Sequence, residues 1–545
     1  MTPVANSQMW SQLLDPLHAL PASALVATIP LVIVLVLMGV LRKSGLVAAL
    51  FGLGSTAALA AMVWQMPVPL IGWSLAYGFA FAAWSILWVV FNGLWLYNLT
   101  IAIGSFDRLR RWIAERASGD ACIQATLVAF CFGALLEGNA GFGVPVAITA
   151  FLLVGLGFQP RRAVLVSLIA NTVPVAFGGV GVPIVALAGV TGLDVMKLSA
   201  AVGRQLPFLS LLLPAYLTLV VGGWSGLRRT WPVALVAGGT FATAQFLVSN
   251  LWGPYATDVV SALTSTFATV LWLRVWSPEP HPDSAPNPKA SHSAASDSPT
   301  RVSLRDVLTG WFPWAVLSVV MIGWSYFQLF PIAQRLVPIP RLHNGVLIAL
   351  YQKPYSAVFA FQPLAGGTAV LVSLLVTAVW FRVAPRVLLD TAVKTLLQLR
   401  VPGLSVLMIV GLAYLYNYSG MAYTLGAALA GVGPVFPFVS SVLGWVACFL
   451  SGSDTSANLL FGNLQVAAAH QLNLNPILMA ATNSSGAVAG KMISPQNIAV
   501  GVTTVGLIGE EGRVLQSAFW HSILFAALIG LLACLQAYVV PGMMP

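Results

Sequence analysis

The sequence predicts an all-α polytopic membrane protein, with about 12 transmembrane helices and two re-entrant hairpins in inverted repeats, and with broken helices at the midplane. Only 7% of the 545 residues are charged, whereas a soluble domain carries about 25% charged residues. Apolar tracts recur from Pro21 to Val540, and each is long enough to cross a hydrocarbon core of about 30 Å. Polar and glycine-rich motifs interrupt several tracts at matching positions in the two halves, which indicates a duplicated transporter architecture.

The expected elements follow the hydropathy of each half. The first half, residues 1–276, is expected to hold spans near 21–41, 45–64, 70–103, 203–223, 231–250 and 256–274, a hairpin over 121–158 and a broken helix over 163–191. Residues 277–310 are expected to form a flexible linker, because the stretch is rich in Pro, Ser, Asp and His. The second half, residues 311–545, is expected to hold spans near 311–330, 366–382 and 519–540, a long tract over 402–433 that is interrupted at Asn417-Tyr418-Ser419-Gly420, a hairpin over 437–470 and a broken helix over 476–508.

The basic residues predict the orientation of the chain. With Arg42-Lys43 in the cytoplasm, most of the 25 Lys and Arg residues fall on the cytoplasmic side, as the positive-inside rule requires. The linker is then cytoplasmic, and both termini are periplasmic. Reading each hairpin as two full spans gives the same orientation, so charge leaves that alternative open; the shortness of the runs favours re-entry.

The two halves share a spacing pattern. Cys131 precedes Glu137 by six residues, and Cys448 precedes Asp454 by the same six. Asn171 precedes Pro183 by 12 residues, and Asn483 precedes Pro495 by 12. The predicted orientation opens the two hairpins to opposite sides of the membrane, so the repeats are expected to be inverted. Such repeats place the substrate site at the bilayer midplane.

Of the 15 acidic residues, only Glu137 and Asp454 are expected to lie deep within apolar tracts, one in each repeat. A carboxylate inside a membrane is costly and is a candidate functional group. Burial disfavours the charged form, so such a group can take up a proton near neutral pH. Both are therefore predicted to couple transport to protons. The alternative for either residue is a buried salt bridge or a hairpin cap.

The hairpin tips contain groups that suit a small anion. The first tip carries Gly138, Asn139, Gly141 and Gly143, and so many glycines near a proline cannot form continuous helix. The second tip carries the hydroxyls of Ser451, Ser453 and Thr455. Helix N-termini at such tips offer free N–H groups to a carboxylate. These hydroxyls can instead cap helices, and the two roles can coexist.

Amide, hydroxyl and cationic side chains near the breaks complete the predicted substrate site. Asn171, Thr172, Asn483 and Ser484 are expected to begin the breaks in the helices that follow the hairpins and to contact the substrate; packing alone is the alternative. Lys491 and Arg204 are the candidates to neutralise the substrate carboxylate. The alternatives are a structural pair of Lys491 with Glu137 or Asp454, and snorkelling of Arg204 to the interface.

Several function classes find no support in the sequence. It has no Walker motif, no convincing dinucleotide fingerprint and no His/Cys metal cluster. We therefore expect a transporter driven by an ion gradient or by exchange rather than an ATP-driven pump or an enzyme, without catalytic residues, metal or cofactor. Nucleic acid is not an expected partner, because the basic residues lie in short loops between spans.

At these motifs the chain resembles the bacterial L-lactate permease family, which includes glycolate permeases. The resemblance is carried by these segments: 132–138, 141–143, 145–149, 203–208, 417–420, 452–456 and 490–496. It implies symport of lactate, and often glycolate, with protons across the inner membrane by alternating access, and kinship with transporters that use an elevator motion. Asn139, Val144 and Ala457 depart from the family pattern, which bears on the preferred monocarboxylate. A channel or carrier for other small organic anions is the alternative.

Overall fold

The structure of the chain, a computed structural model, describes residues 9–41, 43–116, 119–139, 141, 143–276, 303–507 and 509–545. Most of the predicted linker therefore lies outside the described residues. Helices dominate the chain, and 11 helices among the described residues are long and apolar enough to cross a membrane. The prediction of an all-α, multi-pass membrane protein is confirmed. Two of these helices, Ala121–Asn139 and Met421–Ser451, contain parts of the predicted hairpin regions, so re-entry of the hairpins stays a prediction.

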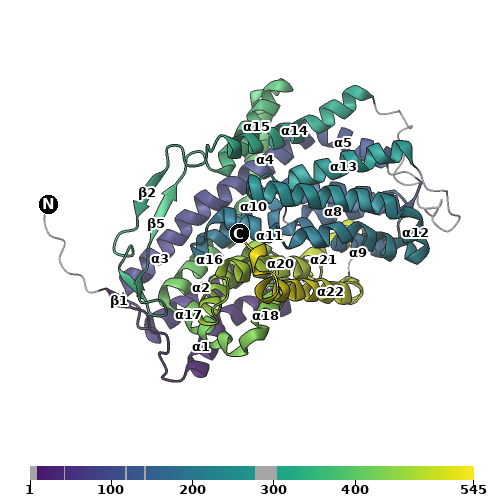
Figure 1. Cartoon of the computed structure of the whole chain (residues 1–545). Helices are drawn as coiled ribbons and strands as arrows, with labels where there is room; N and C mark the ends of the chain where they lie inside the picture. The colour runs from purple at the N-terminus through teal and green to yellow at the C-terminus, as the bar shows by residue number, and fades with distance from the viewer. Residues whose placement is uncertain are drawn as a thin grey trace.

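The first half consists of helices that run side by side (Figure 1). They are α1 (Leu20–Leu35), η1 (Val36–Val40), α2 (Gly45–Met62), α3 (Val68–Phe81), η2 (Ala82–Leu87), α4 (Trp88–Ala102), α5 (Ser105–Arg116), α6 (Ala121–Gln124), η3 (Ala125–Phe132), α7 (Gly133–Asn139), α8 (Val144–Gly155), α9 (Pro160–Ala170), η4 (Val173–Phe177), α10 (Gly178–Thr191), α11 (Val195–Val202), α12 (Leu206–Leu251) and α13 (Thr257–Val275). The two spans predicted near 203–223 and 231–250 form one long element, α12, which Gly223 interrupts with a non-helical conformation.

The second half is also mainly helical. It comprises α14 (Leu304–Tyr326), α15 (Gly366–Trp380), α16 (Pro385–Ser419), α17 (Met421–Leu429), η6 (Ala430–Val435), α18 (Phe436–Ser451), α19 (Asp454–Gln471), α20 (Pro476–Lys491), α21 (Pro495–Thr504), α22 (Glu511–Tyr538) and η7 (Pro541–Met543). Polar caps define many starts: Asp120, Asp194, Ser453 and Asn475 each accept backbone N–H bonds at the start of a helix. The predicted interruption after Asn417 is confirmed, because Gly420 adopts a left-handed conformation between α16 and α17.

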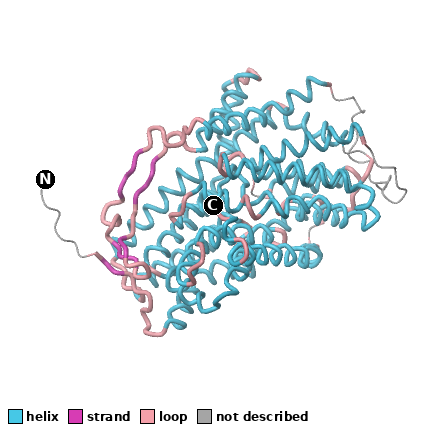
Figure 2. Tube along the Cα trace, in the orientation of Figure 1, coloured by secondary structure: helices cyan, strands magenta, loops and turns pink. Residues whose placement is uncertain are grey.

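Short strands, which the sequence did not predict, gather at one end of the helices. β1 (Trp10–Ser11) pairs in parallel with β3 (Val346–Ile348), and β3 pairs with β4 (Lys353–Pro354). The second sheet pairs β2 (Arg335–Pro338) with β5 (Val358–Phe361) in antiparallel register. Figure 2 shows these strands at the end of the bundle opposite to the end of α13 and the start of α14. We call residues 327–365, which contain β2 to β5, the strand loop.

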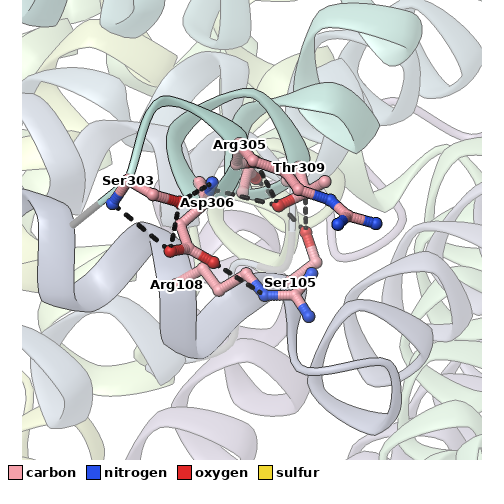
Figure 3. Close-up of polar contacts among 7 residues, drawn as sticks. Ser105, Arg108, Ser303, Arg305, Asp306 and Thr309 are labelled. Carbon is pink, nitrogen blue, oxygen red and sulfur yellow. Dashed lines mark hydrogen bonds and ion pairs between the residues drawn. The ribbon is translucent and has the colours of Figure 1, made fainter.

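The start of α14 is fixed against the surface helix α5 (Figure 3). Ser303 and Asp306 form a capping box, in which each side chain accepts the other residue's backbone N–H. Arg108 lies 3.5 Å from the Asp306 carboxylate, and the Ser105 hydroxyl donates to the Thr309 carbonyl at 2.8 Å. Residues 304–310, which were predicted to form the end of the flexible linker, instead belong to α14, and these contacts fix its start.

One predicted break is misplaced. The sequence predicted that Asn483-Ser484-Ser485-Gly486 begins the break in the second broken helix, but α20 runs without interruption from Pro476 to Lys491. The break follows Lys491, and α21 begins at Pro495. The glycines of this segment serve close packing: a Cβ on Gly486 would lie 2.3 Å from the Ser441 carbonyl, and one on Gly490 would lie 2.2 Å from the Trp445 carbonyl. Backbone contact between α18 and α20, rather than a bend, explains these small residues.

Candidate substrate site

The breaks and tips of the two halves meet around one cavity of about 60 Å³. A cavity needs about 10–15 Å³ to hold one water, so this one has room for a ligand of a few heavy atoms. We call it the lysine cavity. It is lined by Val90, Glu137, Gly141, Val175, Gly178, Gly179, Val182, Pro183, Gly452, Ser453, Asp454, Thr455 and Lys491. Both predicted coupling carboxylates and one predicted cation thus line the same small space.

A buried ion pair joins the two halves at this cavity. The Lys491 ammonium at the end of α20 donates to Glu137 Oε1 on α7 at 2.6 Å, and both side chains are almost fully buried. Asn171, at the end of α9, donates to the other oxygen, Glu137 Oε2, at 2.9 Å. The structural pairing that the sequence left open for Lys491 is therefore present in this conformation. A buried pair of this kind is strongly destabilised when one partner loses its charge.

The break in the first repeat allows the Glu137 side chain to reach its partners. A Cβ on Gly178 would lie 2.7 Å from Glu137 Oε1, so only glycine leaves room for the carboxylate. Gly179, Val180 and Gly181 then adopt three consecutive left-handed conformations. The left-handed region is unfavourable for a β-branched residue such as Val180. The tight backbone path here is therefore maintained by surrounding packing, including Pro254, whose carbonyl carbon and oxygen would lie 2.8 Å from a Cβ on Gly181.

Asp454 lies at the end of a row of hydrogen bonds. Gln465 donates to Asn483 at 3.1 Å, Asn483 donates to Asn458 at 3.0 Å, and Asn458 donates to the Ser484 hydroxyl at 3.1 Å. Ser484 donates in turn to Asp454 Oδ2 at 2.8 Å. The other oxygen, Asp454 Oδ1, is buried without a hydrogen-bond partner. The carboxylate is thus oriented by one oxygen and has a second oxygen available for a proton.

A third deep carboxylate was missed by the sequence analysis. Asp258, in the first turn of α13, is 1% exposed, and neither carboxylate oxygen has a hydrogen-bond partner. Its Cβ would lie 2.9 Å from a Cβ on Gly138, so it packs against the residue next to Glu137, and it lies within electrostatic reach of Glu137 and Lys491. The expectation that Glu137 and Asp454 are the only deep acids is wrong. Asp258 stands near the start of its apolar tract, where sequence alone suggests an interface position.

The remaining predicted site residues differ in how they relate to the cavity. Ser453, Thr455 and Gly141 line it. Asn483 and Ser484 lie behind Asp454 in the row of hydrogen bonds. The others are buried but do not line the cavity. The side chains of Thr172, Asn139 and Ser451 donate to the backbone carbonyls of Leu168, Leu135 and Ser453, respectively. Gly138 and Gly143 belong to the backbone of the first tip. Ser453 also caps α19, so the hydroxyl has the capping role that was left open.

Arg204 lies away from the cavity. Its guanidinium donates to the Asn250 side chain and to the Met543 carbonyl, both at 2.8 Å. It ties the α11–α12 junction to the C-terminal segment and has no part in the substrate site proposed below. The sequence could not separate it from Lys491, because both are basic residues beside a glycine and a proline.

We expect Gly178→Ala to lower transport by about 10-fold or more, because the new methyl group displaces Glu137 Oε1 from Lys491 and a charge-assisted hydrogen bond contributes about 1.5–3 kcal/mol. The backbone of Gly178 has a φ of −62°, which alanine adopts freely, so the fold should be retained. Substrate uptake into proteoliposomes is the measurement. Gly54→Ala is the matched control, because a Cβ there meets nothing within 4 Å. Parental uptake by Gly178→Ala would show that the carboxylate position is not required.

Comparisons with known proteins support one family. The L-lactate permease family model matches residues 23–540. The chain is 41% identical to the glycolate permease of Escherichia coli over 98% of this chain and 99% of that protein. It is 39% identical to an L-lactate permease of Salmonella typhimurium, over 98% of this chain and all of the relative. A crystal structure of the YdaH transporter from Alcanivorax borkumensis is similar at a TM-score of 0.44 and 15% identity, covering 87% of this chain and 89% of that one. The chain belongs to the L-lactate permease family.

Proposed function

We propose that the protein is a proton-coupled symporter that carries lactate, glycolate and related small 2-hydroxy monocarboxylates across the bacterial inner membrane by alternating access. The observation that carries the proposal is the buried Lys491–Glu137 pair in a cavity of about 60 Å³. The names of the relatives, which include L-lactate and glycolate permeases, supply the substrate class. Small volume and a single lining cation among the described residues favour a monocarboxylate over a dicarboxylate.

The charges around the site favour coupling to protons. Three buried carboxyl groups, Glu137, Asp258 and Asp454, surround one ammonium group, that of Lys491. If all four were ionised, the site would carry a net charge of −2, and a bound monocarboxylate would bring it to −3. Buried unpaired charge is costly. Binding of the anion is therefore favourable only when protons enter with it.

The ion pair suggests how one proton opens the site to one anion. When Glu137 takes up a proton, its carboxylate becomes neutral and its pair with Lys491 is lost. The Lys491 ammonium is then free to pair with the carboxylate of the substrate, so proton and substrate depend on each other. Ser453 and Thr455 also line the cavity and can bond the 2-hydroxyl, while Val90 and Val182 offer apolar surface to the methyl group of lactate. Loss of the proton on the opposite side restores the pair and releases the anion.

Transport into proteoliposomes tests the proposal directly. An imposed inward proton gradient should drive labelled lactate and glycolate above their equilibrium concentrations, and dicarboxylates should compete poorly. A channel would bring the concentrations only to equilibrium, so failure to accumulate lactate under a proton gradient would refute symport.

We expect Asp258→Asn to fold like the parent and to lower the number of protons carried per substrate. An amide matches the shape of a protonated acid, and the two oxygens of Asp258 have no donors that would stabilise a negative charge. Simultaneous measurement of internal pH and labelled lactate gives the ratio of protons to substrate. Asp390→Asn, which changes an exposed carboxylate on α16, is the control. An unchanged ratio in Asp258→Asn would assign Asp258 a packing role only.

A further inference from the structure

A second cavity, of about 230 Å³, lies between the helices and the strand loop. We call it the tyrosine cavity, because half of the 12 tyrosines of the chain line it. They are Tyr77, Tyr351, Tyr355, Tyr414, Tyr418 and Tyr423. No Asp or Glu is among the described residues that line it. An anion would therefore meet aromatic walls and phenolic hydroxyls there without repulsion from a lining carboxylate.

Three of the tyrosines are held in place by their own hydroxyl groups. Tyr77 donates to the Val358 carbonyl at 2.9 Å, Tyr414 to the Gly189 carbonyl at 3.1 Å, and Tyr418 to the Ser356 carbonyl at 3.1 Å. Tyr355 stacks on Tyr418 with ring centroids 4.1 Å apart. These bonds make the wall of the cavity rigid, so its shape is built before any ligand arrives.

Two hydrogen-bond donors at this cavity have no acceptor. The Tyr351 hydroxyl is buried without a partner, and its ring lies 4.7 Å from that of His470. The amide nitrogen of Asn463 is also buried without a partner, and the residue is 4% exposed. The Tyr423 hydroxyl is in polar contact with the Asn463 side chain, but the contact lacks hydrogen-bond geometry at the amide nitrogen. An unmade buried bond costs about 1–3 kcal/mol per group, so both donors fit a ligand rich in acceptor oxygens.

The tyrosine cavity and the lysine cavity are placed in sequence along the same two helices. On α10, the lysine cavity reaches Pro183 and the tyrosine cavity begins at Gly189. On α19, Asp454 lines the first cavity and Asn463 lines the second. At 1.5 Å per residue, the separation is roughly 9 Å along α10 and roughly 14 Å along α19. The two cavities therefore follow one another along α10 and α19.

The strand loop beside the tyrosine cavity carries a positive charge. Residues 327–365 contain Arg335, Arg341 and Lys353 but no Asp or Glu. Lys353 acts electrostatically on His470, which lines the cavity. A field of one sign at the mouth of a cleft raises the local concentration of ligands of the opposite sign. Small anions are therefore attracted to the strand end of the bundle.

From these observations we propose that the tyrosine cavity is a second binding site for small 2-hydroxycarboxylates, occupied on the strand side before the anion reaches Lys491. Tyr351 and Asn463 donate to the carboxylate, and the aromatic rings pack against the carbon atoms of the ligand. The cavity has no lining cation among the described residues, so the site holds the anion weakly and passes it on. This inference rests on the proposed substrate class, because the ligand is the same anion.

The number of labelled L-lactate molecules bound at saturation, measured on the purified full chain, tests the inference. The parent should bind two per chain. The double variant Tyr351→Phe/Asn463→Leu should bind one, and so should Lys491→Met, which retains the tyrosine cavity. The double variant should fold, since it removes donors that have no partner. In proteoliposomes, its uptake from the strand side should show a KM raised about 3- to 10-fold with the maximal rate unchanged. Transport from the opposite side should show the same fall in the ratio of maximal rate to KM, because both directions share one equilibrium.

Tyr326→Phe is the matched control, because Tyr326 is 70% exposed at the end of α14 and should bind and transport like the parent. A parent that binds lactate with the same stoichiometry and KM as the double variant would overturn the second site and leave the proposed function standing. A parent that binds no lactate would instead count against the proposed function itself. The two failures are therefore distinguishable.

Discussion

Lys491→Met is expected to weaken the binding of lactate at the lysine cavity by at least about 30-fold, which corresponds to about 2 kcal/mol. The reason is that Lys491 is the cation among the described residues lining this cavity, and the substrate carboxylate would be buried there without a partner. Glycolate should lose the same factor, because it shares the carboxylate. Calorimetry on purified protein measures the affinity separately from transport.

The fold of this variant needs its own control, because Glu137 loses its partner as well. Glu137 can take up a proton to avoid an unpaired buried charge. The double variant Lys491→Met/Glu137→Gln removes both charges together and should be at least as stable as the single variant, yet should still fail to bind either acid at this cavity. Lys394→Met, at an exposed position on α16, should bind both acids like the parent. Parental affinity at the lysine cavity in Lys491→Met would make the lysine purely structural.

Glu137→Gln is expected to separate substrate binding from proton coupling. The amide keeps the shape of the side chain but carries no charge, so Lys491 is permanently free for the substrate. Lactate binding should persist and should lose most of its dependence on pH, and exchange of labelled for unlabelled lactate should continue. Accumulation driven by a proton gradient should fall to the background of empty vesicles.

The comparison of exchange with accumulation in the same proteoliposomes decides this prediction. Asp390→Asn, an exposed acid changed in the same way, should retain both activities. If Glu137→Gln still accumulates lactate with the pH dependence of the parent, the coupled proton is carried elsewhere, and Asp258 and Asp454 become the residues to change. Loss of both exchange and accumulation would show that Glu137 has a role beyond accepting a proton.

The membrane class and the central charged residues could be predicted from sequence for physical reasons. Few charges and long apolar tracts leave no other fold class, and a carboxylate such as Glu137 inside such a tract is unusual enough to be noticed. The end of α16 at Gly420 was also predictable, since glycine readily adopts the left-handed conformation found there. The features that depend on residues close together in the sequence could therefore be predicted.

The rest depends on contacts between distant segments. Asp258 looks peripheral in the sequence and is buried only because α13 packs against Gly138. Gly486 reads as a helix breaker, but it lies inside α20, where it allows contact with the backbone of α18. The strand loop lacks a long periodic pattern. One of its short strands, β3, pairs with β1, which lies more than 300 residues earlier in the sequence. A single sequence does not encode these partners in any local pattern.

The glycine contacts between α18 and α20 have a mechanical consequence. A Cβ on Gly444 would lie 2.0 Å from the Asn483 carbonyl, and Gly486 and Gly490 meet the backbone of α18 in the same way. Helices that touch backbone to backbone cannot slide or roll without collision, so we expect α18 and α20 to behave as one rigid unit. Lys491 is the last residue of α20, and Asp454 follows the end of α18 after a two-residue turn. We therefore expect Lys491 and Asp454 to move together, so that a displacement of this unit relative to α7 would change the distance between Lys491 and Glu137.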